Sequence, residues 1–176
     1  IMQKLHDLRS SGRTDIIPDT ESYSIILRAF AASEGPNAPA LVLKMIRRME
    51  KFAAEGYPAV KPDFKCHNVY LNALLSTMTR EDGNRAQIAK RAEEYLYEML
   101  RSKDEDARPD CWSFNMAISA WSRSGDWELA EKAEALVTAL EKYHAECGYS
   151  SKTEPNTNTW NCLIACYSRS QLIDKA

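Results

Sequence analysis

A dipeptide of proline followed by an acid or an amide recurs through this chain of 176 residues. Successive copies are separated by 44, 47 and 46 residues. The four copies are Pro18-Asp19, Pro62-Asp63, Pro109-Asp110 and Pro155-Asn156. Self-similarity at a period of 20–50 residues is typical of arrays in which each unit packs against its neighbours. No other feature of the sequence constrains the fold as strongly.

Each dipeptide is followed by the same apolar pattern. A ring stands five residues after the proline, an aliphatic residue nine after, and a large apolar residue twelve after. In the third copy these are Phe114, Ile118 and Trp121. The spacing i, i+4, i+7 puts all three on one face of a helix. The ring column holds Tyr23, His67, Phe114 and Trp160. We expect the large aromatic residues of these stripes to lie in the core: Phe30, Trp121, Trp160 and Tyr167.

A second apolar stripe follows each first one, so every unit is predicted to be a hairpin of two helices. The third copy shows it best, with Ala130, Ala133, Leu136, Val137 and Leu140 on one face. The predicted divisions are a half repeat 1–19, repeats 20–63, 64–110 and 111–156, and a partial repeat 157–176 of a longer protein. One hairpin cannot bury its apolar face alone, whereas a stack of hairpins can. The predicted fold is therefore an all-α, α-α solenoid of about eight helices.

Composition limits the function classes. The net charge of −2 and the pI of about 6.0 lower the expectation of a dedicated nucleic-acid binder, although charge segregated on one face would still permit it. No run of 18 apolar residues is present, so no membrane span is predicted. Five cysteines without a CxxC motif indicate free thiols in a reducing compartment. The histidines and carboxylates form no catalytic or metal-ligand pattern, so we expect no enzyme activity, cofactor or metal.

Three segments now resemble pentatricopeptide repeats (PPRs): residues 18–30, 109–125 and 155–167. The resemblance covers nearly the whole chain. It depends on the ring and polar residue placed after the Pro-Asp dipeptide, which tetratricopeptide repeats lack. It implies a right-handed superhelix with the first helices on its concave face. It also implies binding of single-stranded RNA in a mitochondrion or plastid, one base per repeat, in RNA processing, stability or translation.

In that family each base is read by the polar residue after the ring together with the residue after the closing proline. The resemblance implies Ser24 with Asp63 for G, Asn68 with Asp110 for U, and Asn115 with Asn156 for C or U. Asn161 would need a partner beyond the chain. An Asn amide offers both a donor and an acceptor to a pyrimidine edge. Because the third copy is the most regular, its Asn115 is expected to be the best base reader.

Other RNA contacts are implied for four side chains: stacking for Trp112, and phosphate binding for Lys65, Arg123 and Arg169. Trp112, the two arginines and the Asn side chains also have structural alternatives. The Asn side chains could bond locally within the first helical turn, Trp112 could cover the next repeat, and the arginines could be solvated. A second function class also stays open, namely a protein-interaction scaffold or a structural subunit of an organellar ribosome or other ribonucleoprotein assembly, which the acidic pI favours.

Overall fold

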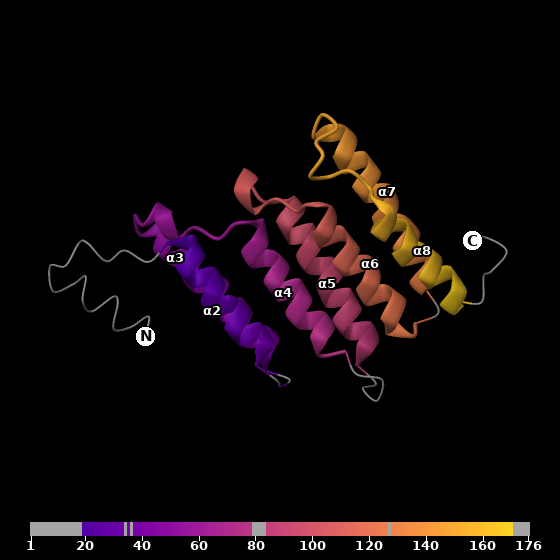
Figure 1. The fold of residues 1–176 in the computed structure, drawn as a ribbon, viewed down its shortest axis with the longest axis horizontal. Coiled ribbons are helices and arrows are strands. Elements are labelled where there is room, and N and C mark those ends of the chain that lie inside the picture. The colour runs from indigo at the N-terminus through magenta and orange to yellow at the C-terminus, as the bar shows by residue number, and fades with distance from the viewer. Residues whose placement is uncertain (1–18, 34, 36, 79–83, 127, 171–176) are drawn as a thin grey trace, which may run out of the picture.

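The structure is a computed structural model that describes residues 19–33, 35, 37–78, 84–126 and 128–170 (Figure 1). Within these ranges it contains α-helices and short 3₁₀ helices and no strand, which confirms the all-α prediction. The α-helices are α2 (Thr20–Ala32), α3 (Ala38–Ala54), α4 (Phe64–Ser76), α5 (Arg85–Leu100), α6 (Cys111–Ser124), α7 (Leu129–Glu146) and α8 (Thr157–Ser170), and the 3₁₀ helices are η1 (Pro58–Val60) and η2 (Glu105–Ala107). The predicted half repeat lies outside the described residues except for Asp19, as do residues 171–176.

The repeated dipeptide sets where α2, α4, α6 and α8 begin; these are called the first helices below. In each case the helix starts directly after the Asp or Asn, whose side chain accepts a hydrogen bond from a backbone N–H three residues on. The bonds run to Asp19 from Ser22 at 2.8 Å, to Asp63 from Cys66 at 3.0 Å, to Asp110 from Ser113 at 2.9 Å, and to Asn156 from Thr159 at 3.2 Å. A helix leaves its first four N–H groups without partners, and such a cap is worth about 1 kcal/mol.

The apolar columns are buried in three of the four copies. Tyr23 and Phe114 are at most 3% exposed, and the aliphatic column of Leu27, Leu71 and Ile118 is fully buried. Trp121 is 4% exposed, as expected for a core residue, whereas Phe30 and Tyr167 are half-buried against the core.

The fourth copy differs from the prediction. Trp160 and Ile164 occupy the same two columns in α8 but are 43% and 50% exposed. Among the described elements α8 packs mainly on α6 and α7. Within the described part of the chain Trp160 is therefore not a core residue, contrary to the prediction.

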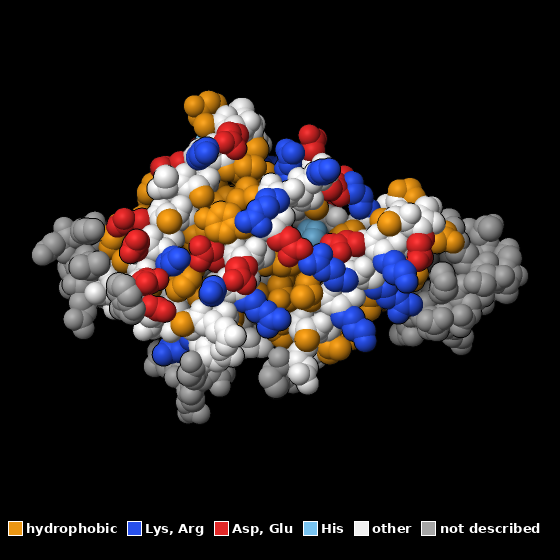
Figure 2. Space-filling view, turned by 180° about the vertical axis from the view of Figure 1, so that it is seen from behind, with side chains coloured by type: hydrophobic (Ala, Val, Ile, Leu, Met, Phe, Trp, Pro, Cys, Tyr) orange, Lys and Arg blue, Asp and Glu red, His pale blue; other side chains and the backbone are white. Residues whose placement is uncertain are grey.

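The helices form two rows. Neighbouring first helices pack side by side, α2 on α4, α4 on α6 and α6 on α8. The second helices of the hairpins, α3, α5 and α7, each pack on the first helix of their own hairpin and on the next first helix, and they make little contact with one another. Figure 1 looks onto the first helices, and Figure 2 shows the opposite face, where acidic and basic side chains alternate.

Replacing Trp121 with Ala tests the core column. The Trp121 ring is buried, and its Nε1–H donates to Glu93 at 3.0 Å. Trp121→Ala should lower the free energy of unfolding by about 3–5 kcal/mol, because it empties core volume. Trp160→Ala is the matched control and should cost much less, since much of that ring is already in water. Urea denaturation of both variants measures the difference, and equal losses would contradict the packing described.

Candidate functional site

Two of the three predicted base-reading pairs meet in the structure. Asn68 Nδ2 donates to Asp110 Oδ1 at 3.1 Å, and Asn115 Nδ2 donates to Asn156 Oδ1 at 3.4 Å. In both pairs the first residue lies on one first helix and the second is the N-cap of the next first helix. The long repeats therefore bring the two members of each pair together.

The Asn68 amide belongs to a network that joins α4 to α6. Its Oδ1 accepts from Ser113 Oγ at 2.6 Å, and Ser113 Oγ also lies 2.9 Å from Asp110 Oδ1. The Asp110 N–H in turn donates to Ser113 Oγ at 3.2 Å, which completes a capping box. Asn68 is half-buried. One hydrogen of its Nδ2 remains for a further acceptor.

Asn115 lies in a different environment, although it occupies the same column. It is 1% exposed, and its Nδ2 also lies 3.6 Å from Cys111 Sγ. Its Oδ1 is buried and has no hydrogen-bond partner among the described residues. A base cannot reach this amide while α6 and α8 keep their places. The expectation that Asn115 is the best base reader does not fit this arrangement.

The remaining predicted polar residues are not brought together. Ser24 is half-buried in α2, and no hydrogen bond links it to Asp63, which caps α4. Asn161 is exposed on α8. Trp112 is 52% exposed on α6, so its ring is accessible for stacking.

The three residues predicted to bind phosphate lie in different environments. Arg169 donates to the Ser122 backbone oxygen at 2.7 Å and to Ser122 Oγ, so it ties α8 to α6. Arg123 is exposed at the end of α6. Lys65 is exposed in the first turn of α4, and its Nζ lies 6.0 Å from the centroid of the Phe64 ring.

Asp110 also lines a hollow of about 360 Å³, together with Phe64, Arg108 and Lys152. Lys152 Nζ lies 5.7 Å from the Phe64 ring centroid, on which Lys65 also converges. Cations at this range are attracted to the ring face. The acids of η2, Glu105 and Asp106, line the same hollow.

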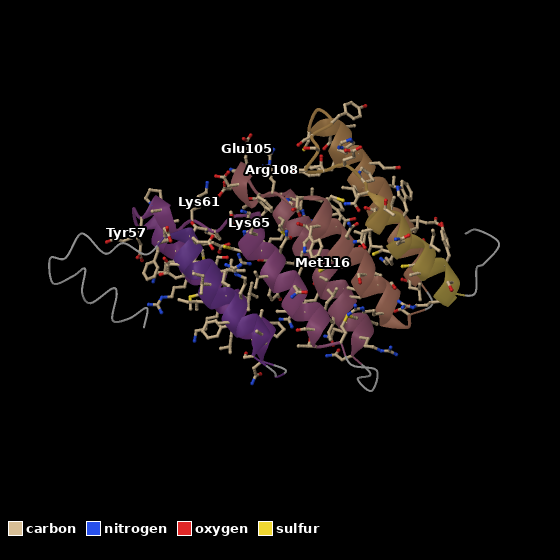
Figure 3. All side chains as sticks on the ribbon, viewed as in Figure 1. Tyr57, Lys61, Lys65, Glu105, Arg108 and Met116 are labelled. Atoms are coloured by element: carbon tan, nitrogen blue, oxygen red, sulfur yellow. The ribbon has the colours of Figure 1, made fainter. Side chains whose placement is uncertain are left out.

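Figure 3 shows where two of these cations lie. Lys65 and Arg108 lie along the edge where the first helices begin. Lys61 lies on the same edge but is bound to Asp104 and does not line this hollow. The sequence argument missed Arg108 and Lys152. A signal for Arg108 was present, because a cation directly precedes the repeated proline in two copies, as Lys61 and Arg108.

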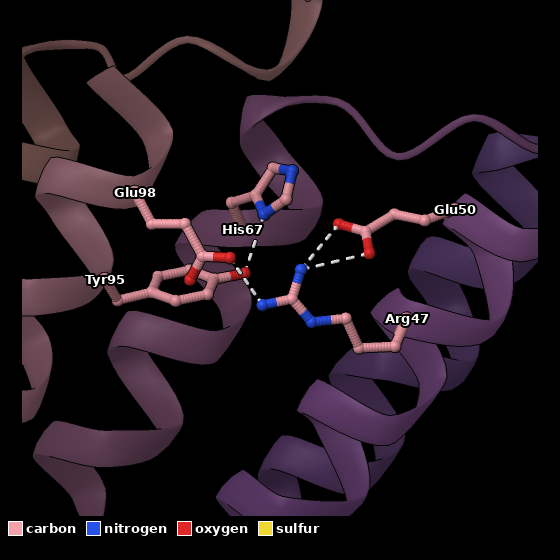
Figure 4. Close-up of polar contacts among 5 residues, drawn as sticks. All are labelled: Arg47, Glu50, His67, Tyr95 and Glu98. Atoms are coloured by element: carbon pink, nitrogen blue, oxygen red, sulfur yellow. Dashed lines mark hydrogen bonds and ion pairs between the residues drawn. The ribbon is translucent and has the colours of Figure 1, made fainter. Parts of the chain in front are cut away.

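A second polar cluster lies between α3 and α5 (Figure 4). His67 Nδ1 lies 2.7 Å from the Tyr95 hydroxyl, and the histidine is only 7% exposed. Arg47 of α3 belongs to the same cluster and binds two glutamates. Its Nη2 lies 2.5 Å from Glu98 of α5, and its Nη1 lies 3.1 Å from Glu50 of α3. His67 stands out in the sequence because it is the one imidazole in a column that otherwise holds Tyr, Phe and Trp. Its partners on the second helices do not stand out in this way.

Burial fixes the protonation of this cluster. Desolvation lowers the pKa of His67 to about 4, and the Arg47 charge acts in the same direction, against Asp63, Glu98 and Asp104. Burial also raises the pKa of Tyr95. Both groups are thus neutral at pH 7. Among the described residues, His67 Nδ1 is the only acceptor for the Tyr95 hydroxyl. We therefore assign the Tyr95 O–H as the donor in this bond, which places the proton of the neutral imidazole on Nε2.

The depressed pKa of His67 predicts a pH dependence of stability. In the unfolded chain this histidine takes up a proton near pH 6.5, whereas in the folded chain it does so only near pH 4. Between these values the unfolded state binds more protons, so stability falls as the pH falls, by up to roughly 3 kcal/mol. His67→Gln removes the titration and keeps a polar partner for Tyr95. Unfolding free energies of both proteins between pH 7.5 and 4 should converge as the pH falls; parallel curves would contradict the assignment.

The cysteines form no disulfide. All five are free thiols. Burial raises the pKa of Cys66 and of Cys166 to about 12, so these thiols stay protonated and are weak nucleophiles. Within the described ranges no group of three or more His, Cys, Asp or Glu residues is placed to hold a metal ion. No helix in the described part of the chain is long and apolar enough to cross a membrane.

No family model, curated protein or solved structure matches this chain. The resemblance to pentatricopeptide repeats therefore stays a prediction from the repeated residues themselves.

Proposed function

We propose that this chain is a PPR-type α-α solenoid that binds single-stranded RNA along its row of first helices, in a mitochondrion or plastid. The observation that carries the proposal is the Asn68–Asp110 pair beside a hollow lined by the Phe64 ring, Arg108 and Lys152, with Lys65 near the same ring. Asp110 belongs both to the pair and to the wall of the hollow. The role in RNA processing, stability or translation follows from the family resemblance.

The groups around this pair supply the interactions that a nucleotide needs. The Asn68 amide keeps one free hydrogen, and the Asp110 carboxylate is an acceptor, so the pair can meet the edge of a uracil. Trp112 is exposed and Phe64 is half-buried, and either ring can stack on a base. Lys65 and Lys152 converge on Phe64 and can neutralise phosphates. This local clustering supports RNA binding by a chain whose net charge is −2.

Removing the two lysines tests the proposal through salt dependence. Each phosphate contact to a single strand contributes about 0.7 to the slope of log affinity against log salt. Lys65→Ala combined with Lys152→Ala should weaken binding of uridine-rich single-stranded RNA and reduce that slope by about 1.4. Fluorescence anisotropy at several salt concentrations measures both quantities.

The matched control carries the same change of charge elsewhere. Lys44 and Lys90 are exposed on the second helices α3 and α5, away from the hollow. Lys44→Ala combined with Lys90→Ala should leave the salt slope within about 0.3 of the original, below half of one phosphate contact. If both double variants change binding equally, the attraction is non-specific and the proposed site is wrong.

A protein-interaction scaffold is the second candidate, and the net charge of −2 and the pI of about 6.0 favour it. Absence of any single-stranded RNA affinity in the unaltered chain would leave this scaffold function, in an organellar ribosome or another assembly, as the better account.

A further inference from the structure

A cavity of about 630 Å³ lies between α3 and α5, on the face opposite the row of first helices. In Figure 2 this face shows a hollow rimmed by charged side chains, with a histidine at its floor. His67 and Tyr95 line the cavity, and Ala53, Met99 and Ala107 give it apolar walls. Its volume falls within the range of roughly 300–1,000 Å³ that is usual for small-molecule sites.

The carboxylates that line this cavity are already paired. Glu50 and Glu98 both bind Arg47. Asp104 binds Lys61, with its Oδ1 2.6 Å from the lysine Nζ. An incoming cation would therefore have to displace an existing ion pair.

Two donors in the lining have no protein partner among the described residues. His67 is 7% exposed as a residue, and its Nε2–H forms no hydrogen bond there, but this atom is not fully buried and stays accessible at the cavity. The exposed guanidinium of Arg101, at the C-terminal end of α5, likewise forms no ion pair within the described ranges. Both donors are therefore available to a ligand that enters the cavity. The lining thus has free donors and apolar walls, and it lacks a free anionic acceptor.

We propose that this cavity binds a small organic carboxylate with an apolar body. The carboxylate accepts from His67 Nε2–H and is attracted by Arg101, while the body packs against Ala53, Met99 and Ala107. This site shares no residue with the surface around the Asn68–Asp110 pair. Failure of RNA binding therefore leaves it untouched.

The test is titration of the whole chain with benzoate, followed by NMR of the histidine ring protons. Benzoate should shift the His67 signals saturably, in the millimolar range. Ala53→Leu adds bulk inside the cavity and should abolish the shift. Ala54→Leu is the matched control, because Ala54 is the next residue of α3, is exposed and does not line the cavity. It should bind benzoate as the unaltered chain does.

Two further measurements fix the chemistry of the ligand. Benzamide has the same ring without the charge and should bind more weakly than benzoate. Arg101→Gln should weaken benzoate roughly two- to fivefold, as expected for a solvent-exposed charge pair. No shift of His67, undiminished binding by Ala53→Leu, equal binding of benzamide, or an unchanged affinity in Arg101→Gln would each overturn the proposal.

Discussion

At the N-caps of α6 and α8, the same side-chain oxygen both caps its own helix and binds the preceding first helix. Asp110 Oδ1 accepts from the Ser113 N–H of its own helix and from Asn68 of the preceding first helix. Asn156 Oδ1 accepts in the same way from the Thr159 N–H and from Asn115. The cap that starts a helix thereby also sets the register of that helix against its neighbour. A shift of the dipeptide by one residue would lose the cap and the link between helices together.

Because the asparagine side chains bind these N-cap residues, few of their hydrogen-bonding groups are left for a ligand. Asn68 keeps one hydrogen of its amide for a new acceptor, whereas Asn115 is enclosed between its neighbours with an unsatisfied oxygen. An unsatisfied buried acceptor costs about 1–3 kcal/mol, so this enclosure is held by the surrounding packing rather than by the amide. Residues in the same column of a repeat can therefore have different accessibility. For this reason the candidate RNA site centres on Asn68 and the Phe64 hollow.

The sequence predicted what local periodicity determines. The helix starts and the buried columns of Leu27, Leu71 and Ile118 follow from spacing alone, because a helix face is set by residue number. The exposure of Trp160 depends on which helix covers α8. No local pattern encodes that.

The same limit applies to the candidate sites. The pairing of Asn68 with Asp110 was implied by the resemblance to pentatricopeptide repeats, and the two side chains are hydrogen-bonded in the structure. The use of Arg169 to hold Ser122 was not predicted, because it depends on the distance between α6 and α8. Lys152 and the His67–Tyr95 pair likewise join elements whose facing surfaces are set only by the stacking of the helices.

A double-mutant cycle between Asn68 and Asp110 tests most directly whether the caps couple successive first helices. Asn68→Ala, Asp110→Ala and the double variant are compared by urea denaturation. In the control cycle Asn72→Ala takes the place of Asn68→Ala, because Asn72 is exposed one turn further along α4. The account predicts a coupling free energy of about 1 kcal/mol for Asn68 with Asp110 and additivity for Asn72 with Asp110. Additivity for Asn68 with Asp110, within about 0.3 kcal/mol, would contradict it.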